Sequence, residues 1–137
     1  MRICIIGGPK TGKSTLARQL GTELGTTVKC TDPKSMGGDA DDRLDLPQCE
    51  RWSAISEDVS HWLDEPGPWI IEGVALVRAL RKWRARNPGQ PPPCDRLLVL
   101  SLKRARTTPQ QDAMSKGVHT VFRELVVWLH DVIEAAR

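Results

Sequence analysis

Short apolar runs alternate along the chain with longer segments in which apolar residues recur every three or four positions. The first run, Arg2–Ile6 (RICII), is rich in β-branched residues and ends in glycines, which is typical of a buried strand in a parallel sheet. Runs of the same character predict three further strands, at Thr26–Thr31, Trp69–Glu72 (WIIE) and Arg96–Leu102 (RLLVLSL).

The segments between these runs have helical periodicity. In Ser14–Leu24 the leucines at positions 16, 20 and 24 lie on one face, and Gly25 supplies a stop. Similar spacing predicts helices at Gln48–Asp64, Val74–Arg86 and Thr120–Ala136. Alternating strands and helices indicate an α/β fold with a short parallel sheet. We expect the strand order 2-3-1-4, with no strand after the last helix.

The bulk composition is that of one globular domain. The chain has 137 residues, of which 39% are hydrophobic and 27% charged. No apolar run approaches the roughly 20 residues needed to cross a bilayer, and the first run is too short for a signal-peptide core. We therefore expect a cytoplasmic protein without a membrane partner. Cys4, Cys30, Cys49 and Cys94 are scattered without a C-x-x-C pair, which predicts reduced thiols rather than a zinc site.

A phosphate-binding motif follows the first predicted strand and opens the first predicted helix. The segment 7–14 (GGPKTGKS) matches G-x-x-x-x-G-K-[ST], the P-loop pattern. Its backbone N–H groups and the helix N-terminus suit the phosphates of ATP, Lys13 suits the terminal phosphates, and the Ser14 hydroxyl suits Mg²⁺. The expected nucleotide-binding residues are Gly8, Pro9, Lys10, Thr11, Gly12, Lys13, Ser14 and Thr15.

The motif fixes the nucleotide site but not the reaction. The chain has no N-K-x-D element for reading guanine, and no apolar strand ends in Asp-Glu as in motor ATPases. These absences favour a kinase, so the whole chain, 1–137, is interpreted as a P-loop kinase domain with a three-layer fold. Residues 33–66 would form a substrate-binding insertion, and 103–118 a lid-like segment.

Two acidic residues follow predicted strands. Asp32 comes after the second strand and is expected at the carboxyl edge of the sheet, where its carboxylate can accept a substrate proton and approach the metal. The alternative is a simple Asp-Pro turn. Glu72 ends the third strand, and we expect it to hold a Mg²⁺-bound water or the substrate. Its alternative role is to cap the following helix.

Basic residues are concentrated in the second half of the chain. Arg78, Arg81 and Lys82 are predicted to share one helical face, which would bind a substrate phosphate or a nucleic-acid backbone unless it only faces solvent. Arg104 and Arg106 follow the fourth strand, where a lid would bring arginines over the triphosphate and make them catalytic.

Two further segments carry a resemblance to a known family. Residues 69–74 (WIIEGV) with 78–83 (RALRKW), and residues 108–118 (TPQQDAMSKGV), together with the P-loop, resemble the compact phage-type kinases that phosphorylate 5-hydroxymethyluracil within DNA. The resemblance implies DNA as the acceptor, a role for Lys116 and the basic helix in contacting it, and a site of action in the bacterial or phage-infected cytoplasm.

More distantly the chain is similar to polynucleotide and nucleoside monophosphate kinases. The latter commonly carry Asp-Gly-Phe-Pro-Arg where this chain has Glu72-Gly73-Val74-Ala75. A nucleotide or small-metabolite kinase, a polynucleotide 5′-end kinase and a non-catalytic nucleotide-binding module therefore remain alternatives.

Overall fold

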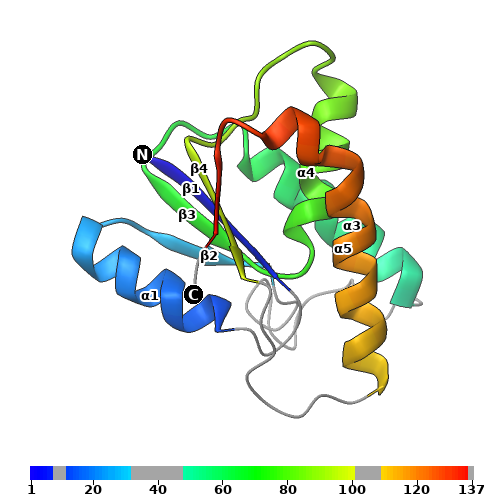
Figure 1. Cartoon of the computed structure of the whole chain (residues 1–137). Coiled ribbons are helices and arrows are strands. Elements are labelled where there is room, and N and C mark those ends of the chain that lie inside the picture. The colour runs from blue at the N-terminus through cyan, green and yellow to red at the C-terminus, as the bar shows by residue number, and fades with distance from the viewer. Residues whose placement is uncertain (8–11, 32–47, 101–108, 136–137) are drawn as a thin grey trace.

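A parallel five-stranded sheet with the order β2-β3-β1-β4-β5 forms the centre of the molecule (Figure 1). The structure, a computed structural model, describes residues 1–7, 12–31, 48–100 and 109–135. The strands are β1 (Arg2–Gly7), β2 (Val28–Cys30), β3 (Trp69–Glu72), β4 (Arg96–Leu100) and β5 (Ile133–Ala135). The α/β class and the predicted order of the first four strands are confirmed.

Helices cover both faces of the sheet. They are α1 (Lys13–Leu24), α3 (Gln48–Trp62), α4 (Leu76–Arg86) and α5 (Pro109–Leu129). Helix α1 lies on one face, whereas α3, α4 and α5 lie on the other, so the molecule has three layers (Figure 1). Among the described residues, no helix combines the length and the apolar character that a bilayer crossing requires.

Side-chain alternation along β1 explains why both faces are covered. Ile3 and Ile5 pack against α1, while Cys4 and Ile6 pack into the larger core beneath α3, α4 and α5. All four are at most 2% exposed. Because both sides of a central parallel strand are buried, its sequence is continuously apolar rather than alternating.

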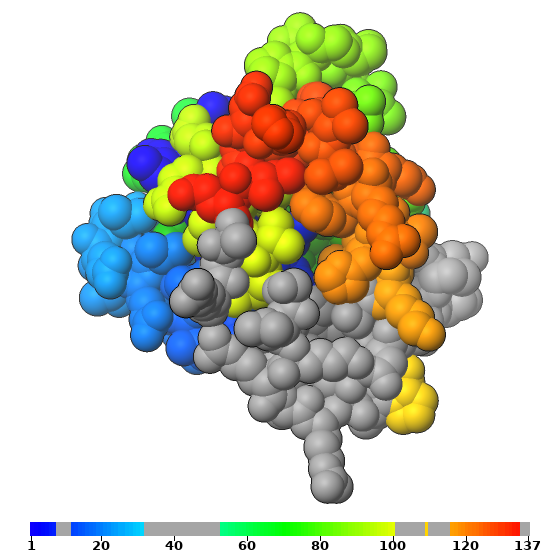
Figure 2. Space-filling model, in the orientation of Figure 1, coloured from blue at the N-terminus to red at the C-terminus, as the bar shows by residue number. Residues whose placement is uncertain are grey.

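Two expectations about the C-terminal third are wrong. A fifth strand follows the last helix, and its residues Ile133–Ala135 pair in parallel with Leu97–Val99 of β4. The last helix begins at Pro109 rather than Thr120 and ends at Leu129 rather than Ala136. Hydrogen bonds from the sheet and the ion pair between Arg96 and Glu134 stabilise this short strand, and neither leaves a local periodic pattern. In Figure 2 the red residues of the C-terminal strand lie next to the orange part of α5 on the face toward the viewer.

The end of α4 packs against the end of α5 through two tryptophans. Trp83 and Trp128 stack with ring centroids 6.0 Å apart and planes inclined by 28°. Trp83 Nε1 donates a hydrogen bond to Asp64 (2.7 Å), and Trp128 Nε1 donates one to the backbone oxygen of Gln90 (2.8 Å). Both indole N–H groups therefore have acceptors, as packed tryptophans require.

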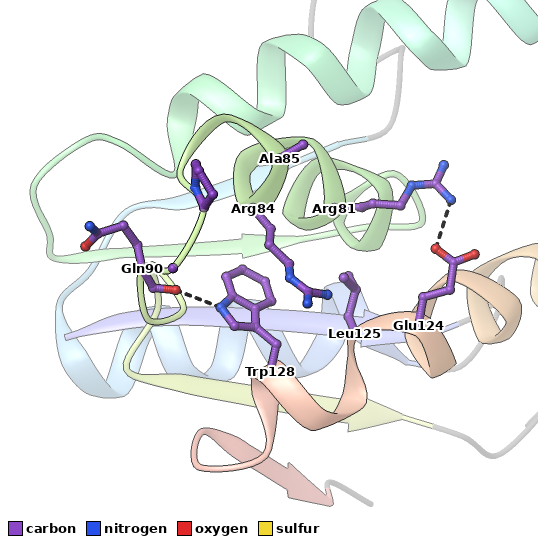
Figure 3. A pocket seen from close by; sticks show the side chains of 9 residues that line it. Arg81, Arg84, Ala85, Gln90, Glu124, Leu125 and Trp128 are labelled. Atoms are coloured by element: carbon purple, nitrogen blue, oxygen red, sulfur yellow. Dashed lines mark hydrogen bonds and ion pairs between the residues drawn. The ribbon is translucent and has the colours of Figure 1, made fainter.

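A pocket of about 520 Å³ opens beside this tryptophan pair. Its lining includes Arg81, Arg84, Gln90, Glu124 and Trp128, and the Arg84 guanidinium lies over the Trp128 ring (Figure 3). Since α4 starts after the carboxyl end of β3 and finishes before the amino end of β4, the pocket lies at the amino edge of the sheet. Phosphate-binding loops open at the opposite edge, so this pocket is not the nucleotide site.

Candidate active site

The first turn of α1 is prepared for an anion. Gly12 precedes the helix with φ 90° and ψ 15°, a left-handed conformation that favours glycine. Its carbonyl accepts the hydrogen bond of Leu16 N (3.0 Å). Gly12 itself offers no side-chain cap, and the N-terminus of a helix with its backbone N–H groups suits an anion.

Lys13 is the first residue of α1 and is only 8% exposed. Burial lowers the pKa of its ammonium from the ordinary value, and the Glu72 carboxylate, with Cys30, partly opposes this effect. The protein thus holds a largely desolvated cation near the Glu72 carboxylate. The added negative charge of a triphosphate would offset the remaining desolvation cost.

Ser14 and Glu72 meet at the end of the sheet. Ser14 Oγ donates a hydrogen bond to Glu72 Oε1 over 3.2 Å. Glu72 is 3% exposed and is the last residue of β3, where its register partners are Ile5 of β1 and Cys30 of β2. The strand order therefore places this carboxylate directly beside the strand that carries the phosphate-binding motif.

The Ser14–Glu72 pair fits a magnesium ion that is shared with phosphates. Two ligands at right angles on Mg²⁺, each about 2.0–2.1 Å from it, stand roughly 3 Å apart, which is close to the separation of these two oxygens. In the described part of the chain, no three His, Cys, Asp or Glu side chains gather into a metal cage. Mg²⁺ is usually bound by one or two protein ligands together with waters and substrate phosphates, so the pair suffices.

Thr31 and Gly73 fix the geometry around Glu72. Thr31 is fully buried, its N–H donates to the backbone oxygen of Glu72 (2.9 Å), and its Oγ1 accepts from the N–H of Ala75 (3.3 Å). Gly73 has φ +139°, and a Cβ built on it would lie 1.9 Å from Thr31 Oγ1. Only glycine therefore allows the chain to turn from β3 into α4 at this point.

The basic residues of α4 do not share one free face. Arg81 Nη1 pairs with Glu124 of α5 at 3.3 Å, whereas Lys82 Nζ donates to the backbone oxygen of Ser53 in α3 at 2.7 Å. Neighbouring helices on both sides of α4 thus engage these two cations, which corrects the expected arrangement.

Arg78 lies apart from those pairs. It is half-buried at the start of α4, and a Cβ built on Gly117 of α5 would lie 2.8 Å from its Nη2. Burial, and secondarily the nearby charge of Arg81, lower the pKa of the Arg78 guanidinium from its ordinary value. Lys116, the neighbour of Gly117, is exposed.

The structure describes only part of the predicted site. Among the proposed nucleotide ligands it contains Gly12, Lys13, Ser14 and the exposed Thr15. The following predicted residues lie outside the described residues: Gly8, Pro9, Lys10, Thr11, Asp32, Arg104 and Arg106.

Sequence reasoning missed three residues of this region: Thr31, Gly73 and Gly117. The turn from strand to helix after WIIE signals a special role for Gly73, because a chain that leaves a sheet edge sharply often needs a positive φ. Thr31 carries a weaker signal, as a hydroxyl residue at the end of a strand. Gly117 carries none, since a glycine within a polar run reads as loop.

Comparisons with solved structures relate the whole chain to small kinases. Shikimate kinase from Aquifex aeolicus matches with a TM-score of 0.60 and 16% identity, over 90% of this chain and 82% of that one. Deoxyadenosine kinase from M. mycoides matches with a TM-score of 0.60 and 14% identity, over 100% of this chain and 90% of that one. Shikimate kinase from Bacteroides thetaiotaomicron matches with a TM-score of 0.57 and 14% identity, over 99% of this chain and 86% of that one.

No protein-family profile and no curated protein sequence matches the chain. At such low identities the structural matches speak for the fold. Together with the sheet order and the phosphate-binding motif, they show that the chain has the α/β fold of P-loop NTPases, in the form that these small kinases share.

Proposed function

We propose that this protein is an ATP- and Mg²⁺-dependent kinase that transfers the γ-phosphoryl group to a hydroxyl of a nucleic acid. The acceptor is the hydroxymethyl oxygen of the base 5-hydroxymethyluracil in DNA. The observation that carries the kinase chemistry is the Ser14–Glu72 contact beside the buried Lys13. These three residues could position a metal ion and the phosphates and neutralise their charge, and phosphoryl transfer depends on such positioning and neutralisation.

Each residue then has a definite role in the transfer. Lys13 would neutralise the terminal phosphates of ATP, while Ser14 and Glu72 would hold Mg²⁺ or a water bound to it, and the ion would supply further charge neutralisation. The acceptor oxygen forms a bond to the γ-phosphorus as the bond to the ADP oxygen breaks. Asp32 takes the proton from the acceptor hydroxyl. Arg104 and Arg106 neutralise charge on the transferred group.

DNA as the acceptor is supported by the two segments that resemble the phage-type kinases. Residues of these two segments, far apart in sequence, approach each other where Arg78 of α4 lies next to Gly117 of α5. Arg78, Arg81 and Lys116 would bind the acceptor there. To do so, Arg81 must give up its ion pair with Glu124 and bind the acceptor in its place.

A nucleotide or small-metabolite kinase is the second candidate. The fold comparisons are consistent with it, because the structures that match include shikimate kinases and a deoxyadenosine kinase. A polynucleotide 5′-end kinase would use the same phosphate chemistry on a strand terminus.

Transfer from radiolabelled ATP onto matched acceptors tests the proposal. Duplexes with 5-hydroxymethyluracil or with thymine at the same positions differ only in the base hydroxyl, so we expect label in the first alone. Equal labelling of both duplexes would indicate strand ends. Labelling of free nucleosides or monophosphates, with neither duplex labelled, would overturn the DNA proposal in favour of the second candidate.

Salt dependence gives an independent criterion. Binding to polymeric DNA releases counterions and weakens steeply as salt rises, whereas a mononucleotide acceptor gives a shallow dependence. We expect the KM for the duplex to rise steeply with salt, and this slope to flatten in the Arg78→Ala/Arg81→Ala double variant with little change in the KM for ATP.

A further inference from the structure

Arg78 is an exception among the cations of this protein. Five other lysines and arginines in the described ranges are buried or half-buried, and each interacts with a carboxylate or a backbone oxygen: Lys13 with Glu72, Arg2 with Asp95, Lys29 with Glu65, Lys82 with Ser53, and Arg96 with Glu134. Within those same ranges no hydrogen bond or ion pair is found for Arg78. A half-buried guanidinium without an anion has lost hydration without compensation, which native folds normally avoid.

Gly117 makes room for this guanidinium. It lies within α5 with an ordinary helical backbone, and it is not among the glycines with positive φ. Its conformation therefore does not require glycine, and glycine inside a helix is less stable than alanine. What the site uses is the missing side chain, because a Cβ would lie 2.8 Å from Arg78 Nη2.

The position of Arg78 relates it to the transfer site. It is the third residue of α4, and α4 starts four residues after Glu72, at the carboxyl edge of the sheet. Lys13 and Ser14 belong to the same edge, because β1 and β3 are parallel neighbours. An anion held by Arg78 would therefore lie at the edge where phosphate is transferred.

We propose that Arg78, seated over Gly117, binds a phosphate group of the acceptor, and that Gly117 is the positioning residue that admits it. This inference rests on the proposed kinase function and gives its acceptor a definite chemical feature. The planar guanidinium presents paired N–H groups that match phosphate oxygens, which favours phosphate recognition. The phosphate belongs either to the DNA backbone beside the modified base or to a free nucleotide.

A binding experiment tests the proposed phosphate site at Arg78 without any phosphoryl transfer. The protein is first saturated with Mg·ADP to fill the P-loop, and the Tm is then measured with inorganic phosphate against chloride of equal ionic strength. We expect phosphate to raise the Tm of the parent but not of Arg78→Met, whose Tm without phosphate equals or exceeds that of the parent. Arg2→Met, which breaks a formed ion pair, lowers the Tm and serves as the contrast.

Two results would overturn the proposed phosphate site at Arg78. One is an equal increase in Tm with phosphate in the parent and in Arg78→Met, and the other is a loss of Tm in Arg78→Met as large as in Arg2→Met. The second would mean that Arg78 is structural. A protein that does not bind Mg·ADP would instead contradict the proposed nucleotide site, so the two failures are distinguishable.

A kinetic experiment identifies the source of the phosphate. We expect Gly117→Ala to fold with an unchanged or higher Tm and to raise the KM for the acceptor about 10-fold or more, with the KM for ATP unchanged, as for loss of a charged hydrogen bond. Arg123→Ala removes an exposed charge from the same helix and should leave both values unchanged. An unchanged acceptor KM in Gly117→Ala would refute the positioning role.

Neutral methylphosphonate linkages, placed one at a time beside the modified base, separate the two sources. If the phosphate is a DNA linkage, one position raises the KM of the parent and has no further effect in Arg78→Ala. If it belongs to a nucleotide, the monophosphate outperforms the nucleoside in the parent, and this advantage disappears in Arg78→Ala. Additive effects in both series would refute the contact.

Discussion

The Ser14 hydroxyl donates a hydrogen bond to the Glu72 carboxylate over 3.2 Å, and this contact joins the first turn of α1 to the end of β3. The two residues are 58 positions apart in sequence. Parallel pairing of β1 with β3 brings them together, so the phosphate-binding helix and the acidic strand end act as one unit.

Glu72→Gln preserves the shape of this pair but removes its charge. We expect the Mg²⁺ concentration for half-maximal transfer to rise, or kcat to fall, by at least the roughly 10- to 100-fold that loss of a metal ligand's outer partner costs, because a neutral amide binds Mg²⁺ more weakly than a carboxylate. A Mg²⁺ titration at saturating ATP measures both. Glu23→Gln, an exposed carboxylate of α1, is the control. An unchanged Mg²⁺ profile would leave Glu72 with only a structural role.

Lys13→Ala removes the buried cation of the nucleotide site. We expect transfer to collapse and Mg·ATP to stop raising the Tm, while Arg18→Ala, an exposed change in the same helix, leaves both intact. Because burial lowers the pKa of Lys13 below its ordinary value of 10.5, the ATP affinity of the parent should fall as pH rises through that lowered pKa. Near-normal turnover in a folded Lys13→Ala protein would contradict the assigned role.

Asp32→Asn tests the proposed base. The amide retains the shape but cannot take up the proton, so we expect kcat to fall by ~10²-fold or more with little change in the KM for ATP. Single-turnover transfer from labelled ATP isolates the chemical step. A full rate in the variant would make Asp32 a turn residue.

Gly73→Ala places a Cβ 1.9 Å from Thr31 Oγ1 at φ +139°. We expect the free energy of unfolding to fall by about 3 kcal/mol or more, from backbone strain and overpacking together. Gly25→Ala is a matched control, because Gly25 also has positive φ (+61°) but nothing within 4 Å of its added Cβ, so it should cost only about 1–2 kcal/mol. Equal losses in urea unfolding would show that the Thr31 contact adds nothing.

Asp95 links stability to acid pH. Hydrogen bonds from the backbone N–H (2.7 Å) and the guanidinium of Arg2 hold the pKa of Asp95 below its ordinary value of 3.8. Its stabilising contribution is therefore present above that value and is lost as pH falls through the lowered pKa. We expect Asp95→Asn to lower the Tm at pH 6 and to converge with the parent as the pH drops below 3.8. A Tm difference that stays constant with pH would contradict this linkage.

The parts of the fold that were predictable carry their own local signal. The run WIIE predicted β3 with its observed bounds, because a strand buried on both faces is apolar throughout. Glu72, the last residue of that strand, was expected to hold a Mg²⁺-bound water or the substrate, or else to cap the following helix. The contact with Ser14 follows from the strand order, which agrees with the order 2-3-1-4 expected for the first four strands.

The parts that were missed depend on partners remote in sequence. The three residues of β5 continue the helical spacing of α5, and their pairing with β4 decides their conformation. The first half of α5 is polar and contains Gly117, so its sequence resembles a loop. The reason for a glycine at position 117 is its closeness to Arg78, which lies 39 positions earlier and cannot be inferred from the local sequence.

The stacked rings of Trp83 and Trp128 give the protein a built-in optical label. Two indoles 6.0 Å apart interact strongly enough for their absorption transitions to couple, which produces a paired signal of opposite sign in circular dichroism. The pair lies near the ends of α4 and α5, about 7 to 8 Å along α4 from Arg78. A signal that persists when acceptor binds would mean that the helices stay together there and that only side chains adjust around the acceptor. A signal that collapses would report the two helices parting.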